Sequence, residues 1–193
     1  KEANPILIGD KFQRIIPDKK TAAILYLINR AEVRNSELSK EEIKMLEEYL
    51  KEVNAAEDKE LTGIEVLAYA SPDGEYDFNE KLAEKRKVSA DKYLDRTLNR
   101  NKIEVAEPQF NQKSTAEDWE GFKKLVEASD IKDRDLILRV LSMYSDPAVR
   151  EKEIKNMAAT FEILKDDILP RLRRSELAVN VNLIGYSDEE ILD

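Results

Sequence analysis

The chain has no cysteine and no histidine among its 193 residues. Without cysteine there is no disulfide, thiolate zinc site, iron–sulfur cluster or cysteine nucleophile. Without histidine the chain lacks the commonest general base, the usual transition-metal ligand and any Ser-His-Asp arrangement. Most hydrolytic mechanisms are therefore excluded. We expect a protein that is not an enzyme, with no cofactor and no metal site.

Basic residues and long apolar runs are also scarce. Lys and Arg number 32 against 41 Asp and Glu, which gives a net charge of −9. A nucleic-acid binder needs a basic surface that displaces counterions from phosphates, so nucleic acid is not an expected partner. The longest apolar run, residues 22–28, is far below the roughly 18 residues of a membrane helix. We expect a chain that does not itself span a membrane.

The two ends of the sequence suggest a piece of a longer protein. The chain opens without methionine on Lys1-Glu2-Ala3 and closes on an acidic stretch, residues 188–193. No secretory signal is recognisable in the first residues, and in an excised fragment any targeting peptide could have been cut away. With only 5 glycines and 6 prolines, the chain shows no flexible linker and no repeat, which favours one domain.

The first half of the chain alternates strand and helix patterns. Ser39 and Glu42 form an S-x-x-E capping box before a helix with Ile43, Leu46 and Leu50 on its inner face. The predicted elements are a strand at 23–28 buried on both faces, a helix at 40–53, a strand at 63–70, a turn at 71–74, a helix at 77–98 whose inner face carries Leu82, Ala90, Tyr93 and Leu94, and a weak third strand at 103–106.

The second half of the chain is predicted to be helical until its last strand. Asp146-Pro147 has the preferred order of an N-cap followed by proline at the first helical position. The predicted elements are a helix capped by Thr115 with Trp119, Phe122 and Val126 inside, a helix with Leu136, Val140 and Met143 inside, a helix from Asp146-Pro147 that Pro170 closes, and a half-buried strand at 177–183. The order β-α-β-α-β, helices, β predicts an α+β sheet with parallel pairs and helices on at least one face.

The segment 68–86 carries the most informative motif. A buried strand stops at the turn Ser71-Pro72-Asp73-Gly74, and a helix follows. The segment resembles the peptidoglycan-binding domain of the OmpA-like (OmpA C-terminal, MotB-like) family, whose signature is G-Y-T-D-x-x-G-x-x-x-Y-N-x-x-L-S-x-x-R-A. The matching positions are Tyr69, Gly74, Asn79, Leu82 and Arg86, with Phe78 in place of the tyrosine.

Weaker matches lie on either side of this segment. Residues 29–33 fit the N-x-x-x-[LI] pattern after the family's first strand, and residues 173–177 are similar to its R-R-V-x-[IV] start of the last strand. The resemblance implies a two-layer sandwich with a mixed sheet, forming one domain over 1–193. Its core would span about 22–107 and 171–185, with a helical insertion at about 115–169. Residues 184–191 look like a branch joined to tetratricopeptide-type repeats.

The family's ligand is the diaminopimelate side chain of peptidoglycan, which ends in an ammonium and a carboxylate. In the family an aspartate binds the ammonium and an arginine binds the carboxylate. Arg86 occupies the arginine position here, but Ser71 stands where the aspartate is expected. Ser71 supplies no charge, and Asp73 is the nearest carboxylate that could replace it. The resemblance therefore implies a site formed by Arg86, Asp73, Ser71, Asn79, Asn29 and Gly74.

Each of these residues also has an alternative structural role. Arg86 would pair with neighbouring acids or hold the turn, and Asp73 with Gly74 is ordinary turn chemistry. Asn79 would bond backbone near the helix start, and Asn29 would end its strand.

Outside the motif, the spacing of Trp119 and Phe122 suits core packing better than a sugar-stacking platform. The acidic pairs at 41–42, 47–48 and 166–167 read as solvated faces rather than cation sites.

Two functional hypotheses follow from the resemblance. In the first, the chain is a non-catalytic, structural peptidoglycan-binding module in the periplasm that anchors the outer membrane of a Gram-negative cell envelope to the wall. In the second, the wall site has decayed and the domain is a protein-interaction scaffold that binds a partner through its helical insertion. The replacement at Ser71 favours the second hypothesis, whereas the retained Arg86 and Gly74 favour the first.

Overall fold

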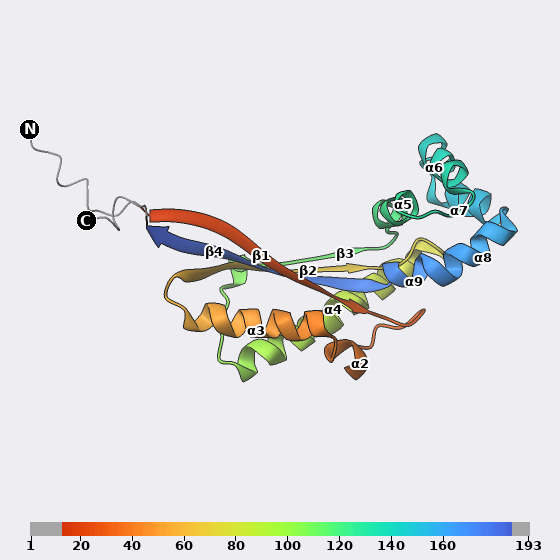
Figure 1. Cartoon of the computed structure of the whole chain (residues 1–193). Helices are drawn as coiled ribbons and strands as arrows, with labels where there is room; N and C mark the ends of the chain where they lie inside the picture. The colour runs from red at the N-terminus through yellow and green to blue at the C-terminus, as the bar shows by residue number, and fades with distance from the viewer. Residues whose placement is uncertain (1–12, 187–193) are drawn as a thin grey trace, which may run out of the picture.

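A computed structural model describes residues 13–186 of the chain. Its strands form one four-stranded sheet in the order β1-β4-β2-β3 (Figure 1). Strand β4 is antiparallel to both β1 and β2, and β2 pairs with β3 in parallel. The predicted α+β class with a mixed sheet is therefore confirmed. The strands are β1 (Gln13–Leu25), β2 (Lys59–Tyr69), β3 (Phe110–Thr115) and β4 (Arg174–Tyr186).

Two long helices cover one face of this sheet (Figure 1). They are α3 (Glu41–Ala55) and α4 (Tyr76–Arg100), preceded by the short α2 (Asn35–Leu38). The inner faces predicted for both long helices are confirmed, because all of those side chains are buried against the sheet. The main core joins Ile43, Leu46, Leu50 and Val53 of α3, Ala90, Tyr93 and Leu94 of α4, and Ile64, Val66, Leu177, Val179 and Val181 of the central strands.

Five further helices, which we call the helical block, lie beyond one end of the sheet (Figure 1). They enclose a second apolar core that includes Phe122, Val126, Ile137 and Leu164. The helices are α5 (Trp119–Glu127), α6 (Arg134–Met143), α7 (Pro147–Lys155), α8 (Ala158–Asp167) and α9 (Leu169–Leu172). None of the helices within residues 13–186 is both long enough and apolar enough to cross a bilayer.

The first strand differs from its prediction in bounds and in burial. Strand β1 begins ten residues earlier, at Gln13, and ends at Leu25. Leu27 and Ile28 lie beyond it and are 53% and 56% exposed. The strand is half-buried rather than buried on both faces, because β1 lies at the sheet margin and its polar N-terminal part is held by pairing with β4.

The predicted capping box before α3 is wrong. The Ser39 hydroxyl donates to the carbonyl of Asn35 over 2.9 Å, since Ser39 ends the short helix α2. The Glu42 carboxylate accepts the N–H of Ala23 over 2.9 Å instead of bonding back to the cap. Lys40 is the N-cap of α3, without a side-chain cap bond. Contacts with neighbouring elements take both side chains away from the local motif.

The third predicted strand, 103–106, is also wrong. Ile103 is buried in the main core but belongs to a loop, which continues into a 3₁₀ turn at Glu107–Gln109. The third strand is β3, at Phe110–Thr115, whose polar sequence has no apolar alternation. Thr115 therefore ends a strand, and Asp118 caps α5 by accepting the N–H of Gly121 over 3.0 Å.

The helical block departs from prediction in its divisions. Asp146 caps α7 as predicted and accepts the N–H of Ala148 over 2.9 Å. The expected single helix up to residue 168 is divided into α7 and α8, and Pro170 lies inside α9 rather than closing the helix. In α6, Val140 is buried as predicted, but Leu136 and Met143 are exposed, and Ile137 and Leu141 take their places in the core.

Candidate functional site

The turn after β2 closes on itself through short polar contacts. The Ser71 hydroxyl bonds the Asp73 carboxylate over 2.5 Å. The Asn79 amide donates to the carbonyls of Ser71 and Asp73 at 3.3 and 2.9 Å. Gly74 has a φ of 98°, a conformation that side-chain-bearing residues rarely adopt. The turn therefore brings together four of the predicted site residues, and their polar groups mainly satisfy one another.

Arg86 points inward from α4 and has no exposed surface. Its Nε donates to the carbonyl of Arg30 over 2.9 Å, and its Nη1 donates to that of Tyr69 over 3.0 Å. Its Nη2 donates to the carbonyl of Leu27 over 3.3 Å, and its Cζ lies 5.1 Å from the centre of the Tyr26 ring. The guanidinium thus joins the end of β2 to the loop after β1. In this arrangement a carboxylate ligand has no access to it.

The surroundings of Arg86 alter its proton affinity. Burial lowers the pKa of Arg86 to about 10, so the side chain remains a cation at neutral pH. Burial also raises the pKa of the neighbouring Tyr26 to about 12. The hydroxyls of Tyr26 and Ser175 each lie 3.1 Å from the backbone carbonyl of Arg86 and donate to it. Both the side chain and the backbone of Arg86 are therefore integrated into the core.

Asn29 lies in the loop that Arg86 holds. Its φ is 58°, in the left-handed region that asparagine tolerates better than most residues. The loop closes with the N–H of Arg30 donating to the carbonyl of Leu27 over 3.0 Å. Backbone conformation accounts for an asparagine at this position, and its predicted ligand contact stays a prediction.

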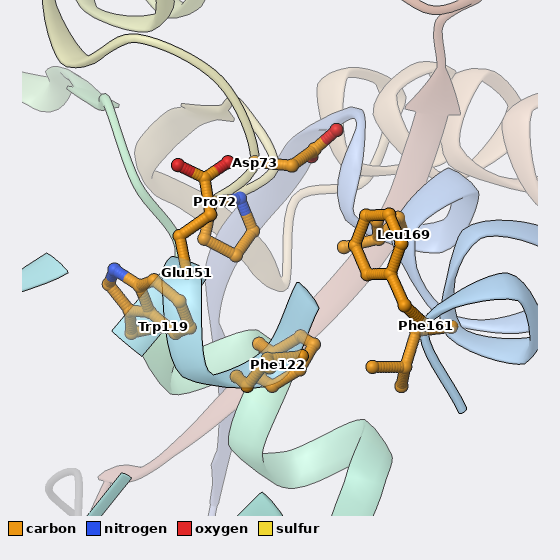
Figure 2. A pocket seen from close by; sticks show the side chains of 9 residues that line it. Pro72, Asp73, Trp119, Phe122, Glu151, Phe161 and Leu169 are labelled. Carbon is orange, nitrogen blue, oxygen red and sulfur yellow. The ribbon is translucent and has the colours of Figure 1, made fainter. Parts of the chain in front are cut away.

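The helical block packs against the turn after β2. The N–H of Gly74 donates to the Glu151 carboxylate of α7 over 2.6 Å. Figure 2 shows Pro72 and Asp73 above the aromatic side chains of the block, with Glu151 beside them. The apolar space between them is only about 20 Å³, room for about one water molecule. It is lined by Pro72, Asp73, Trp119, Phe122, Glu151, Ile154, Phe161, Leu164 and Leu169.

A larger, open groove of about 670 Å³ lies next to this contact between the turn and the helical block. Burial raises the pKa of Glu117 at its edge, and the neighbouring Glu151 and Asp146 raise it further. Lys155 offsets part of this charge by pairing with Glu151 over 3.0 Å. Within residues 13–186, no three acidic side chains converge as a metal site requires. The groove is lined by Gly74, Glu75, Tyr76, Glu117, Asp146, Pro147, Ala148, Glu151 and Lys155.

Arg174 fixes the helical block to the sheet. Its Nη1 lies 2.7 Å from the Asp118 carboxylate, and its Nε lies 2.7 Å from that of Glu176. Its Cζ stands 4.0 Å from the centre of the Tyr69 ring. Burial opposes the charged form of Arg174, but the bonds to Asp118 and Glu176 outweigh it and raise its pKa. Asp118 is not among the predicted site residues, because the sequence pattern predicted the cap of this helix at Thr115.

Arg173, which precedes Arg174 in the chain, has fewer bonded partners than its neighbour. It is 9% exposed, and among the described residues its side chain makes no hydrogen bond or ion pair. Burial lowers its pKa, and the nearby Asp73 carboxylate opposes that effect. Its guanidinium nitrogens are not among the buried atoms that lack a partner in the described residues, so they reach solvent, and Arg173 is a candidate for binding an anionic group near the turn.

Comparison with known proteins gives a structural likeness. No protein-family model matches the chain. No curated protein matches it either. The chain is similar to a solved structure, the OmpA-like domain of FopA1 from Francisella tularensis subsp. tularensis SCHU S4. The two are 14% identical with a TM-score of 0.42, and the alignment covers 96% of this chain and 90% of that chain.

Proposed function

We propose that this chain is a non-catalytic OmpA-like scaffold of a bacterial cell envelope that binds a protein partner through its helical block. The motif at 68–86 and the order of strands and helices support the OmpA-like part of the proposal. The envelope location, in the periplasm beside the outer membrane, follows from the same resemblance. The domain would form one unit, in which α5 to α9 are an insertion between β3 and β4.

The observation that carries this proposal is the environment of Arg86. Its donors bond the carbonyls of Arg30, Tyr69 and Leu27, and none of its surface is exposed. A wall ligand would have to displace this loop and leave part-buried carbonyls without their donors, at up to about 1–3 kcal/mol each. The position of the expected acid is Ser71, which already bonds Asp73. A structural role for Arg86 is therefore favoured over ligand capture.

The helical block offers a surface suited to a protein partner. A groove of about 350 Å³ runs between α5 and α6, with Arg150 of α7 at its side. The Arg150 guanidinium stands 5.4 Å from the centre of the Trp119 ring. Aromatic and arginine side chains dominate the binding energy of many protein interfaces. We expect an apolar side chain of the partner to contact Trp119, Leu138 and Leu141.

Site-specific photocrosslinking in the source cells tests the proposal. A photoreactive residue at Lys123, beside the groove, should yield one discrete crosslinked protein, and the same residue at exposed Lys44 of α3 should not. The purified partner should bind the wild type at least about tenfold more tightly than Ser142→Arg, which obstructs the groove. Ser145→Arg, an exposed position that does not line the groove, is the matched control. Equal binding by both variants contradicts the proposal.

Peptidoglycan binding is the second candidate, and Arg173 favours it. A guanidinium without a bonded partner and the nearby carboxylate of Asp73 are the two charges that a zwitterionic headgroup requires. Under the scaffold proposal, the chain should not sediment saturably with purified peptidoglycan. Saturable sedimentation that Arg173→Ala and Asp73→Ala abolish, and that Asp130→Ala retains, would establish wall binding instead.

A further inference from the structure

The two margins of the sheet are protected differently. At the β1 margin, the N–H of Ala23 donates to Glu42 over 2.9 Å, and the N–H of Leu25 donates to Glu37 over 2.8 Å. Pro17, on the same side of β1, has no N–H to offer. Carboxylates thus occupy the outward N–H groups near the end of β1, and Pro17 interrupts the margin, two common protections of sheet edges.

The β3 margin has no such protection. Within the described part of the chain, β2 is the only strand that pairs with β3, which ends the sheet, and α4 is the long helix that packs against it (Figure 1). The carbonyl of Thr115 accepts the N–H of Ala70 on the β2 side over 3.0 Å. Because successive residues of a strand turn their backbone groups to opposite sides, those of Gln112 and Ser114 face outward, together with the carbonyl of Phe110, whose N–H already donates to the carbonyl of Glu107. These groups are available to another chain.

An acidic flank accompanies the open margin. Ser114 of β3 donates to the Glu84 carboxylate of α4 over 3.1 Å, so this face of α4 meets β3. Asp91 lies seven residues further along, on the same face of the helix. Its Oδ1 is buried and has no hydrogen-bond partner within residues 13–186. Burial, with Asp95 next in effect, raises the pKa of Asp91 to about 6. The nearby Lys87 lowers that pKa in part, but Lys87 pairs with Glu84 over 2.9 Å, and Oδ1 of Asp91 is left without a donor in the described part of the chain.

We propose that the outer edge of β3 binds an extended basic peptide segment of another protein, which adds a strand beside β3 and directs lysine or arginine side chains to Asp91. Main-chain bonds to Gln112, Ser114 and the carbonyl of Phe110 supply the affinity, as in other strand-addition complexes. Alternate side chains of the added strand point to the α4 side of the sheet. The net charge of −9 and the donor-free carboxylate select a basic segment. This edge lies apart from the groove of the helical block.

The backbone part of the proposal is tested with a labelled, capped peptide of alternating lysine and valine, seven residues long, by fluorescence anisotropy on the full chain. Gln112→Pro removes an outward N–H without taking a bond from β2, so it should weaken binding at least about tenfold. Gln112→Ala keeps the N–H and should stay within about twofold. Equal affinity of Gln112→Pro and wild type overturns the proposal.

If Gln112→Pro does not fold, hydrogen exchange of the wild-type chain with and without the peptide still tests the proposal. The peptide should slow exchange of the amides of Gln112 and Ser114, whereas the amide of Phe110 already bonds the carbonyl of Glu107. No binding, or protection at β1 instead, overturns the proposal. Slower exchange of the same amides on raising the protein concentration without peptide also overturns it, because the occupant is then a second copy.

The charge part of the proposal is tested separately. Asp91→Asn should weaken binding by about threefold to tenfold, whereas Asp77→Asn, an exposed carboxylate of α4, should not. A peptide with glutamate in place of lysine should not bind, and equal binding by it overturns the proposal. Ser142→Arg, at the groove of the helical block, should bind the lysine peptide like wild type, so failure of the proposed function leaves this result unaffected.

Discussion

Arg86 donates from Nη1 to the carbonyl oxygen of Tyr69 over 3.0 Å, and this bond joins α4 to the last residue of β2. Tyr69 also lies under Arg174, which holds the helical block. The end of β2 therefore contacts two buried or half-buried guanidinium groups with different tasks. One holds the loop after β1, and the other connects the sheet to α5.

The first prediction concerns the removal of the buried Arg86 side chain. Arg86→Ala leaves three part-buried carbonyls without donors and opens a cavity, so we expect a loss of roughly 3 kcal/mol in the free energy of unfolding. Arg86→Lys should recover only part of it, because an ammonium lacks the planar fork. Urea unfolding measures both. Arg96→Ala, exposed on the same helix, is the control, and equal stability of Arg86→Ala and wild type would refute the structural role.

The second prediction concerns the turn after β2. Gly74→Ala should cost about 1–2 kcal/mol, because φ at this position is 98°. A Cβ there would lie 3.7 Å from the Asn79 amide, an ordinary contact, so the cost is one of backbone conformation. Gly185→Ala in β4, with open space around the added Cβ, should leave thermal stability unchanged or slightly higher. Similar melting temperatures for the two variants would count against the argument.

The third prediction concerns the joint between α5 and the sheet. Asp118→Ala removes the cap of α5 and the ion pair with Arg174, whose side chains are 4% and 14% exposed. We expect a loss of about 2–4 kcal/mol, followed through the single tryptophan, Trp119, during urea unfolding. Asp135→Ala breaks only an exposed pair with Arg134 and should change stability by less than about 0.5 kcal/mol. Equal losses in the two variants would contradict the role of the joint.

The fourth prediction concerns pH. The folded-state pKa of Asp91 is about 6, above the ordinary 3.8, so the folded chain holds the proton more tightly than the unfolded one. Its contribution to stability is complete below about pH 3.8 and is lost as pH rises through 6. Asp91→Asn should therefore exceed wild-type stability at about pH 7.5, by roughly 1 kcal/mol after allowing for partial exposure. The gap should close near pH 4. Urea unfolding at both pH values checks this, with Asp130→Asn as control.

Local periodicity was enough to predict the elements that line the main core. Ile43, Leu46 and Leu50 recur at helical spacing, and the face they form is the buried face of α3. Gly74 marked a turn that needs a positive φ, and the structure has one there. These features follow from the sequence because an amphipathic pattern directly reflects which side chains must leave water.

Such patterns could not predict polar contacts or contacts between residues far apart in the chain. Strand β3 is polar and exists because its backbone pairs with β2, a partner some 45 residues earlier in the chain. Arg86 was recognised as a motif position, but its spacing did not reveal where its guanidinium points. The carbonyls that accept its bonds come from a loop 56 and 59 residues away.

The sequence alone determined the class of fold and the apolar faces of its long helices, because burial of apolar side chains acts through local spacing. Only the tertiary structure decided which carbonyls surround Arg86, which acid joins Arg174, and which margin of the sheet stays open. Hydrogen bonds and ion pairs need donors and acceptors within about 3 Å, and only the folded arrangement brings these distant residues that close.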